Sequence, residues 1–427
     1  MSIKDSAKTF TTRFKLDSHH AIERFGVFFG AIVVTGALVF GLSGASAFTN
    51  TQATLSSTAL YTPSFTTSKT QISGDVSGVY VSDDRTRAMV FMEFSDTAQI
   101  SANAEDYRAF LTASTTDITR EDLRSEVTGS VYVFGSTGYM GVVLESGTAF
   151  PAQILDLTMR ANTELVYKEG ERVSDVTEGA SFRDFDQWRL FFNPGGSEAT
   201  VSPALSTDTI DVGAVYNELV IADKEAEVRA EMDSQLNLML TDLNRVADGE
   251  AELLRATVDG GTLQLMAPEV PAQIANDRVT GDAATDDSES TLGLQTQFVM
   301  PLGYEFDWRN GSVADGYLKD LIPTDSNYIT YLKSRVDEKA DSLSINDMEW
   351  LLNDGTDLKR DYTTSSVTME PLFEIMNNLS SAYQDYYNDK AQYQVDLYSE
   401  LLDLEVELRS VEDNVTINDN PEALLTY

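Results

Sequence analysis

Residues 25–48 read FGVFFGAIVVTGALVFGLSGASAF and contain no charged side chain. An α-helix over this stretch, rising ~1.5 Å per residue, is about 36 Å long and exceeds the ~30 Å hydrocarbon core of a bilayer. The stretch therefore predicts a single transmembrane helix. It divides the chain into a short leader, residues 1–24, and a much longer remainder.

The charges beside this predicted helix indicate its orientation. Basic side chains next to a membrane span favour the cytoplasmic side, so we expect a cytoplasmic N-terminus and the bulk of the chain outside the cell membrane. The basic residues of the leader are Lys4, Lys8, Arg13, Lys15 and Arg24.

A cleaved signal peptide is the alternative interpretation of residues 25–48. Ala45, Ser46 and Ala47 have the A-x-A form of a signal-peptidase site, and cleavage after Ala47 would yield a secreted protein. The apolar run is longer than the ~7 to 15 residues usual in a signal peptide, which favours a retained anchor.

Small residues recur along one face of the predicted membrane helix. Such residues allow a second helix to approach closely in lipid, so we expect them to mediate helix packing in the membrane. They are Gly26, Gly30, Ala37 and Gly41.

The composition excludes several classes of function. The 427 residues carry a net charge of −39, which disfavours nucleic-acid binding. The chain has no cysteine, and its two histidines, His19 and His20, both lie in the leader. The exported part therefore has no Ser-His-Asp triad and no His or Cys metal site. We expect no catalytic residues, no cofactor and no metal.

The remainder of the chain changes from strand-like to helix-like periodicity. Short β-branched and aromatic runs separated by turn residues predict an antiparallel β-sandwich or barrel, and later apolar spacings of three and four predict long amphipathic helices. The fold class is therefore α+β. The predicted parts are a Ser/Thr-rich stalk at 49–73, a β-sandwich-like domain at 74–203, a long amphipathic helix at 212–260, an acidic loop and short aromatic segment at 261–325, a helical region at 326–413 that ends in a long helix and includes a shorter one at 344–354, and a tail at 414–427.

The two long helices are expected to pair through their apolar and tyrosine-rich stripes. Two arrangements remain open: an antiparallel hairpin within one chain, or a coiled coil between chains. The residues expected at the helix interface are Leu236, Leu243, Leu379, Tyr386, Tyr393, Leu397 and Leu404.

This architecture indicates a protein that positions other proteins. We expect a membrane-anchored extracytoplasmic scaffold subunit of a cell-envelope or surface assembly, of the secretion, conjugation or appendage type. Its expected partners are proteins, in a homo-oligomer or an envelope assembly, and not nucleic acid. The alternative is a secreted or surface binding module, an adhesin or receptor, that uses the loops of the β-domain.

A carboxylate-based wall hydrolase is the third hypothesis. Paired carboxylates can carry glycoside hydrolysis without histidine. The acid pairs beside a tryptophan are Glu305 and Asp307 before Trp308, and Asp184 and Asp186 before Trp188.

Overall fold

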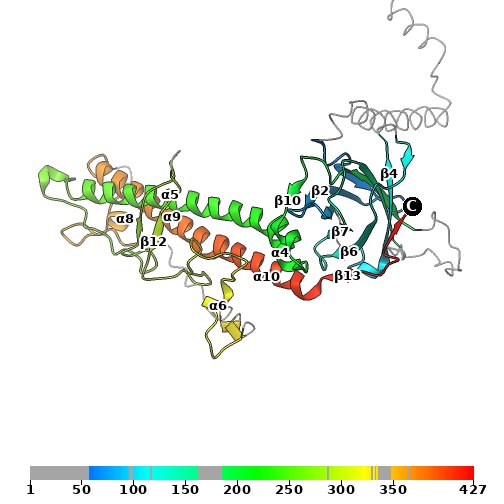
Figure 1. Ribbon diagram of the computed structural model, residues 1–427. Coiled ribbons are helices and arrows are strands. Elements are labelled where there is room, and N and C mark those ends of the chain that lie inside the picture. The colour runs from blue at the N-terminus through cyan, green and yellow to red at the C-terminus, as the bar shows by residue number, and fades with distance from the viewer. Residues whose placement is uncertain are drawn as a thin grey trace, which may run out of the picture. The chain divides into compact units, whose positions relative to one another are not determined.

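The computed structural model describes residues 57–95, 100–115, 118–161, 185–285, 288–327, 330–331, 333–334, 348–363 and 366–427. The predicted membrane span, with its small residues Gly26, Gly30, Ala37 and Gly41, lies outside these residues. Among the residues that are described, no helix has both the length and the apolar composition needed to cross a bilayer. The chain divides into two compact units, Met1–Ile210 together with Val415–Tyr427, and Asp211–Asn414 (Figure 1).

The first unit is built from two sheets whose strand pairs are antiparallel, apart from two parallel pairs at the sheet edges, β10 with β2 and β14 with β4. One sheet has the order β1 (Ser64–Thr66), β2 (Ser73–Val81), β3 (Arg87–Phe94), β7 (Tyr139–Ser146), β6 (Val127–Val133) and β13 (Thr416–Asn418), with β10 (Thr200–Val201) beside β2. The other has the order β14 (Leu424–Thr426), β4 (Tyr107–Ser114), β8 (Ile154–Ala161) and β9 (Gln187–Phe192), with β5 (Arg120–Glu121) beside β4.

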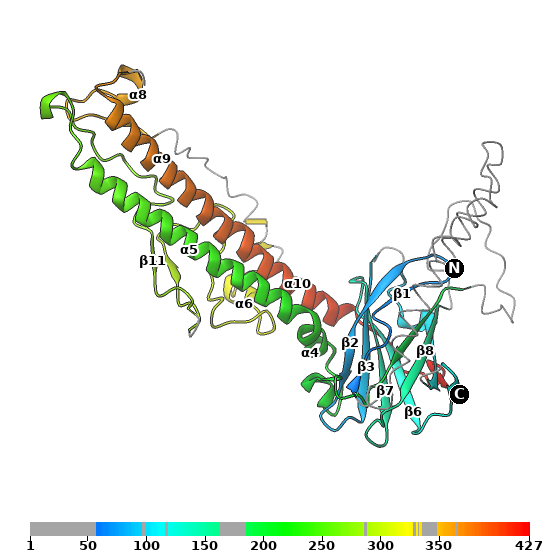
Figure 2. The same ribbon diagram turned by 90° about the horizontal axis from the view of Figure 1, so that it is seen from above.

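The two sheets enclose one hydrophobic core (Figure 2). Side chains along β4 alternate between buried and half-buried, as expected for a strand with one face on a core. The ring of Trp188 lies in this core, 5.3 Å from the Phe94 ring and 6.1 Å from the Tyr107 ring, centroid to centroid. β1 contacts β9 on one side of this core and β14 contacts β6 on the other, and Leu60, just before β1, forms a bridge with Phe192 of β9.

The last residues of the chain, expected as a tail, belong to the first unit. Within 415–427, β13 pairs with β6 and β14 pairs with β4, so this segment adds one strand to each sheet. The second unit is therefore inserted in the chain between two parts of the first.

Two long helices of 42 and 45 residues form the frame of the second unit. The first consists of α4 (Val212–Tyr216), the π-helical turn η4 (Asn217–Ile221) and α5 (Ala222–Leu253), and the second of α9 (Glu370–Ala391), the π-helical turn η7 (Gln392–Leu397) and α10 (Tyr398–Asn414). The Asp211 side chain accepts a hydrogen bond from the Ala214 amide and so caps the first helix.

The long helices pack against each other within one chain, α5 against α9 and α10 against α4 and α5 (Figures 1 and 2). Of the two arrangements left open by the sequence, the intramolecular hairpin is the one observed. We call this helix pair, with the segments packed on it, the helical unit.

Shorter elements connect the two long helices. They are η5 (Asp259–Gly261), the hairpin of β11 (Arg278–Thr280) and β12 (Gly293–Gln295), α6 (Leu318–Leu321) and α8 (Leu358–Asp361). Residues 344–354 were expected to be helical, but the described part from Met348 onward is extended, and Leu352 forms a bridge with Leu265. Pairing with a segment distant in the sequence has overridden the local helical spacing.

Candidate functional site

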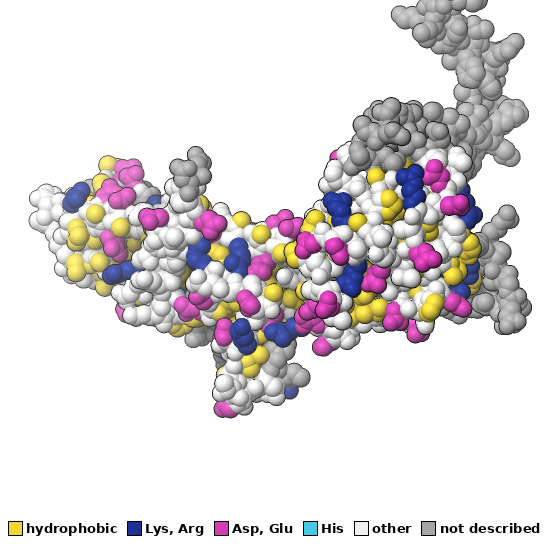
Figure 3. Space-filling model, in the orientation of Figure 1, with side chains coloured by type: hydrophobic (Ala, Val, Ile, Leu, Met, Phe, Trp, Pro, Cys, Tyr) yellow, Lys and Arg dark blue, Asp and Glu magenta, His cyan; other side chains and the backbone are white. Residues whose placement is uncertain are grey.

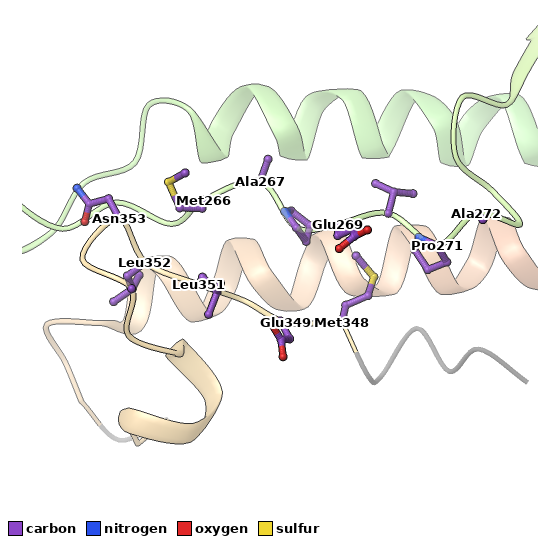
Figure 4. A pocket seen from close by; sticks show the side chains of 13 residues that line it. Met266, Ala267, Glu269, Pro271, Ala272, Met348, Glu349, Leu351, Leu352 and Asn353 are labelled. Carbon is purple, nitrogen blue, oxygen red and sulfur yellow. The ribbon is translucent and has the colours of Figure 1, made fainter.

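A groove of about 820 Å³ lies in the helical unit near the end where α5 stops and α9 begins (Figure 4). Two segments form its walls, residues 266–272 and residues 348–355; both are extended except at the turns that begin at Ala272 and Asn353. We call this site the end groove.

The two walls separate because the short ladder of backbone hydrogen bonds between them ends just before Pro268. The Met266 amide donates to the Leu351 carbonyl at 2.8 Å, and the Asn353 amide donates to the Gln264 carbonyl at 2.9 Å. Pro268 and Pro271 follow in the first wall and have no N–H group to continue the ladder. The two segments therefore part beyond Met266, and the space between them is the end groove.

The side chains that line the end groove are mainly apolar, with one acidic residue from each wall. Met266 is 51% exposed and Leu351 is 39% exposed, which is unusual for side chains of this size. Glu269 and Glu349 contribute one exposed carboxylate from each wall. The lining residues, all of them described, include no Lys, Arg or His.

Further apolar side chains are exposed at the same end of the helical unit. Val367, shortly before α9, is 81% exposed, and Leu254, directly after α5, is 71% exposed; these are the two highest values among the large apolar side chains of the described residues. Figure 3 shows hydrophobic side chains mixed with acidic and basic ones at this end. Such a concentration of exposed apolar surface is typical of an interaction site.

A buried ion pair fixes the connecting segments to α9. The Lys390 ammonium is fully buried and donates to the Asp277 carboxylate at 2.7 Å, the Gln273 carbonyl at 2.6 Å, the Phe298 carbonyl at 2.7 Å and the Thr296 hydroxyl at 2.8 Å. Burial lowers the pKa of Lys390, and the bond to Asp277 opposes that shift. Because Lys390 has no access to solvent, we assign it a structural role.

Two buried glutamates hold a second connecting segment between α5 and α10. Glu405 accepts hydrogen bonds from the amides of Tyr317 at 2.6 Å and Leu318 at 2.8 Å, and Glu225 accepts from the amide of Val313 at 3.1 Å. These carboxylates satisfy backbone donors that would otherwise be buried without a partner.

A pair of carboxyl groups lies between α5 and α9. Burial, and then a hydrogen bond with Asp242, raises the pKa of Asp389 to about 6. Arg245 binds Asp242 at 2.7 Å and Asp385 at 2.8 Å on the same face. A shifted carboxyl is a common feature of catalytic sites, but neither member of this pair lines the end groove.

The residues expected at the helix interface lie inside the helical unit. Leu236, Leu379, Tyr386, Tyr393, Leu397 and Leu404 are buried, and Leu243 is half-buried. Two of the tyrosines also bind the connecting segments: Tyr386 donates to Asp277 at 3.0 Å, and Tyr393 accepts from the Trp308 indole at 2.9 Å.

The acid pairs of the hydrolase hypothesis occupy different environments. Asp186 is buried and accepts from the amides of Lys69 at 2.7 Å and Thr70 at 2.8 Å, and its predicted partner Asp184 lies outside the described residues. Glu305 and Asp307 are exposed, and hydrogen bonds from Asn310 lower the pKa of Asp307. Asp186 and Asp307 each anchor a turn. Within the described residues, no group of three or more His, Asp or Glu side chains could hold a metal ion.

Sequence reasoning did not find the end groove. Its local signal is the run Met266, Ala267, Pro268, Glu269, Val270 and Pro271, in which two prolines interrupt an apolar segment. Comparison of the chain with protein-family models, with curated proteins and with solved structures found no match.

Proposed function

We propose that this chain is a membrane-anchored, extracytoplasmic interaction protein that serves as a scaffold subunit of a cell-envelope or surface assembly. The observation that carries the proposal is the exposed apolar end groove on a helix pair built from one chain. The uncharged run at 25–48, behind a basic leader, supports a single transmembrane anchor with the N-terminus in the cytoplasm.

The helical unit suits the role of a rigid spacer. A helix of 45 residues is about 65 Å long at ~1.5 Å per residue. The buried pair of Lys390 and Asp277, together with Glu225 and Glu405, ties the connecting segments to this frame. In the proposal, the Ser/Thr-rich stalk, whose later part at Ser64–Thr66 is strand β1 of the first unit, and the β-sandwich-like unit connect the anchor to this coiled-coil-like helix pair. The partners are proteins.

The test is the intact mass and membrane partition of the full chain expressed with its native N-terminus in a bacterial host. We expect a full-length mass in the membrane fraction, and degradation of the chain by protease added outside the cytoplasmic membrane. The matched variant Ala47→Leu blocks the A-x-A site. Its mass should differ from that of wild type only by the difference between leucine and alanine, and it should stay in the membrane fraction.

A soluble product that begins at Phe48, and that Ala47→Leu returns to the membrane fraction, would contradict the anchored scaffold. That result would favour the alternative, a secreted binding module released after Ala47.

A further inference from the structure

We propose that the end groove binds an extended segment of a partner protein by strand addition, and that this segment carries alternate apolar residues with Lys or Arg between them. The inference rests on the proposed function, because it names the class of partner that the scaffold would take.

The backbone of the walls is partly open beyond the short ladder: the Trp350 carbonyl accepts from the Leu358 amide and the Pro271 carbonyl from the Ile274 amide, but other main-chain groups remain. Within the described parts of the chain, the N–H groups of Glu269 and Glu349 have no hydrogen-bond acceptor. The ladder ends at Met266 and Leu351. Because Pro268 and Pro271 cannot donate from the first wall, an extended segment in the groove would continue the ladder by pairing with the second wall, at Glu349 and Leu351. Addition of a strand to an open edge is a recurring mode of peptide recognition, in which main-chain bonds give affinity and alternate side chains give specificity.

The apolar side chains in the lining of the end groove suit the apolar residues of such a segment. Met266 and Leu351 are exposed at the point where the walls part. Methionine is unbranched and polarisable, and it adapts to partners of different shape. The volume of about 820 Å³ lies within the ~300 to 1,000 Å³ usual for ligand sites.

Charge selects the type of partner. Glu269 and Glu349 lie on opposite walls, the lining contains no cation among its described residues, and the chain carries a net charge of −39. An acidic segment, a nucleic acid or an anionic lipid surface is repelled, whereas Lys and Arg beside the apolar positions complete ion pairs with these two glutamates.

The experiment is selection of a phage-displayed library of random dodecapeptides on the full chain in detergent micelles, followed by fluorescence polarisation with the enriched peptides. Two groove variants are compared: Met266→Ser/Leu351→Ser, and Glu269→Gln/Glu349→Gln. The matched charge control is Glu227→Gln/Glu400→Gln, which removes two exposed carboxylates from α5 and α10.

We expect enriched peptides with alternating apolar and basic residues. Their affinity should fall at least tenfold for the Met266 and Leu351 variant, about three- to tenfold for the Glu269 and Glu349 variant, and less than twofold for the control. Proline at a central polar position of the peptide should weaken binding about tenfold, because it removes a main-chain donor.

Two results would overturn the inference. One is that no peptide binds wild type more tightly than it binds the Met266 and Leu351 variant. The other is an equal loss of peptide affinity in the Glu269 and Glu349 variant and in the charge control. Neither result would affect membrane partition of the full chain, so failure of this inference is distinguishable from failure of the proposed anchor.

Discussion

Asp389 makes the stability of the helical unit depend on pH. Its pKa is raised from the ordinary 3.8 to about 6 by burial and by Asp242. A carboxyl whose folded pKa exceeds its unfolded value stabilises the fold while it is protonated. That contribution is complete below about pH 4 and is lost as the pH rises through about 6.

The variant Asp389→Asn keeps a hydrogen-bond donor for Asp242 at every pH. We expect it to match wild type near pH 4 and to exceed it near pH 7.5 by about 1 kcal/mol in free energy of unfolding, a figure reduced for the partial exposure of the side chain. Urea unfolding at both pH values, followed by far-ultraviolet circular dichroism, measures the difference. Glu400→Gln, an exposed change on α10, is the control; a difference for Asp389→Asn that does not vary with pH would contradict the prediction.

Lys390 gives a second prediction at the scale of single residues. The variant Lys390→Met leaves the Asp277 carboxylate buried with Tyr386 as its remaining side-chain donor among the described residues. Loss of one member of a buried ion pair costs about 3 to 5 kcal/mol, so we expect a loss of that size in the free energy of unfolding.

The double variant Lys390→Met/Asp277→Asn separates the ion pair from the packing around it. Because the second change removes the unpaired charge, we expect the double variant to be more stable than Lys390→Met alone. Urea unfolding of wild type, both single variants and the double variant completes the cycle. Strictly additive losses would contradict coupling between Lys390 and Asp277.

At the scale of elements, the long helices were predictable and the C-terminal strands were not. The apolar spacing over 212–253 and 370–414 repeats for ten or more turns. A helical pattern of this length does not arise by chance, so it predicts a helix from the local sequence alone. β13 and β14 have three residues each, and their pairing partners β6 and β4 lie about 300 positions earlier in the chain. No local pattern encodes such pairing.

The end groove was unpredictable for the same reason. Its walls are about 80 residues apart in the sequence, and they meet only because the Met266 amide finds the Leu351 carbonyl. The sequence predicted a loop within 261–325, but not that a second segment would lie opposite it. The frame of the helical unit was predictable from local apolar spacing, whereas the site arises from contacts between its connecting segments.

β14 gives a prediction at the same scale. Leu424 is buried in the core of the first unit and packs so closely on β6 that a Cβ added to Gly129 would lie 2.8 Å from its side chain. We expect Leu424→Asp to cost about 3 kcal/mol or more, because it places a carboxylate in an apolar core.

Thr426→Asp is the matched control, since it places the same carboxylate at an exposed position of the same strand. We expect it to change the free energy of unfolding by less than about 0.5 kcal/mol. Urea unfolding followed by near-ultraviolet circular dichroism, which reports the buried Trp188 cluster, measures both variants. Equal losses for the two variants would show that β14 does not close the core.

For the whole molecule, the net charge of −39 predicts a fold that gains stability from salt. Repulsion among like charges opposes the compact state, and the screening length falls from about 10 Å at 0.1 M salt to about 3 Å at 1 M. We expect the melting temperature to rise by several degrees over this range of NaCl. CaCl₂ at matched ionic strength is the control. An equal rise in melting temperature identifies screening, whereas a larger rise, already present at millimolar calcium, would contradict screening alone and reveal a cation site.

NaCl should also weaken binding of a basic segment at the end groove, because the ion pairs of that segment with Glu269 and Glu349 are exposed. Stability and binding should therefore respond to salt in opposite directions, as expected if the acidic surface opposes folding and attracts the partner.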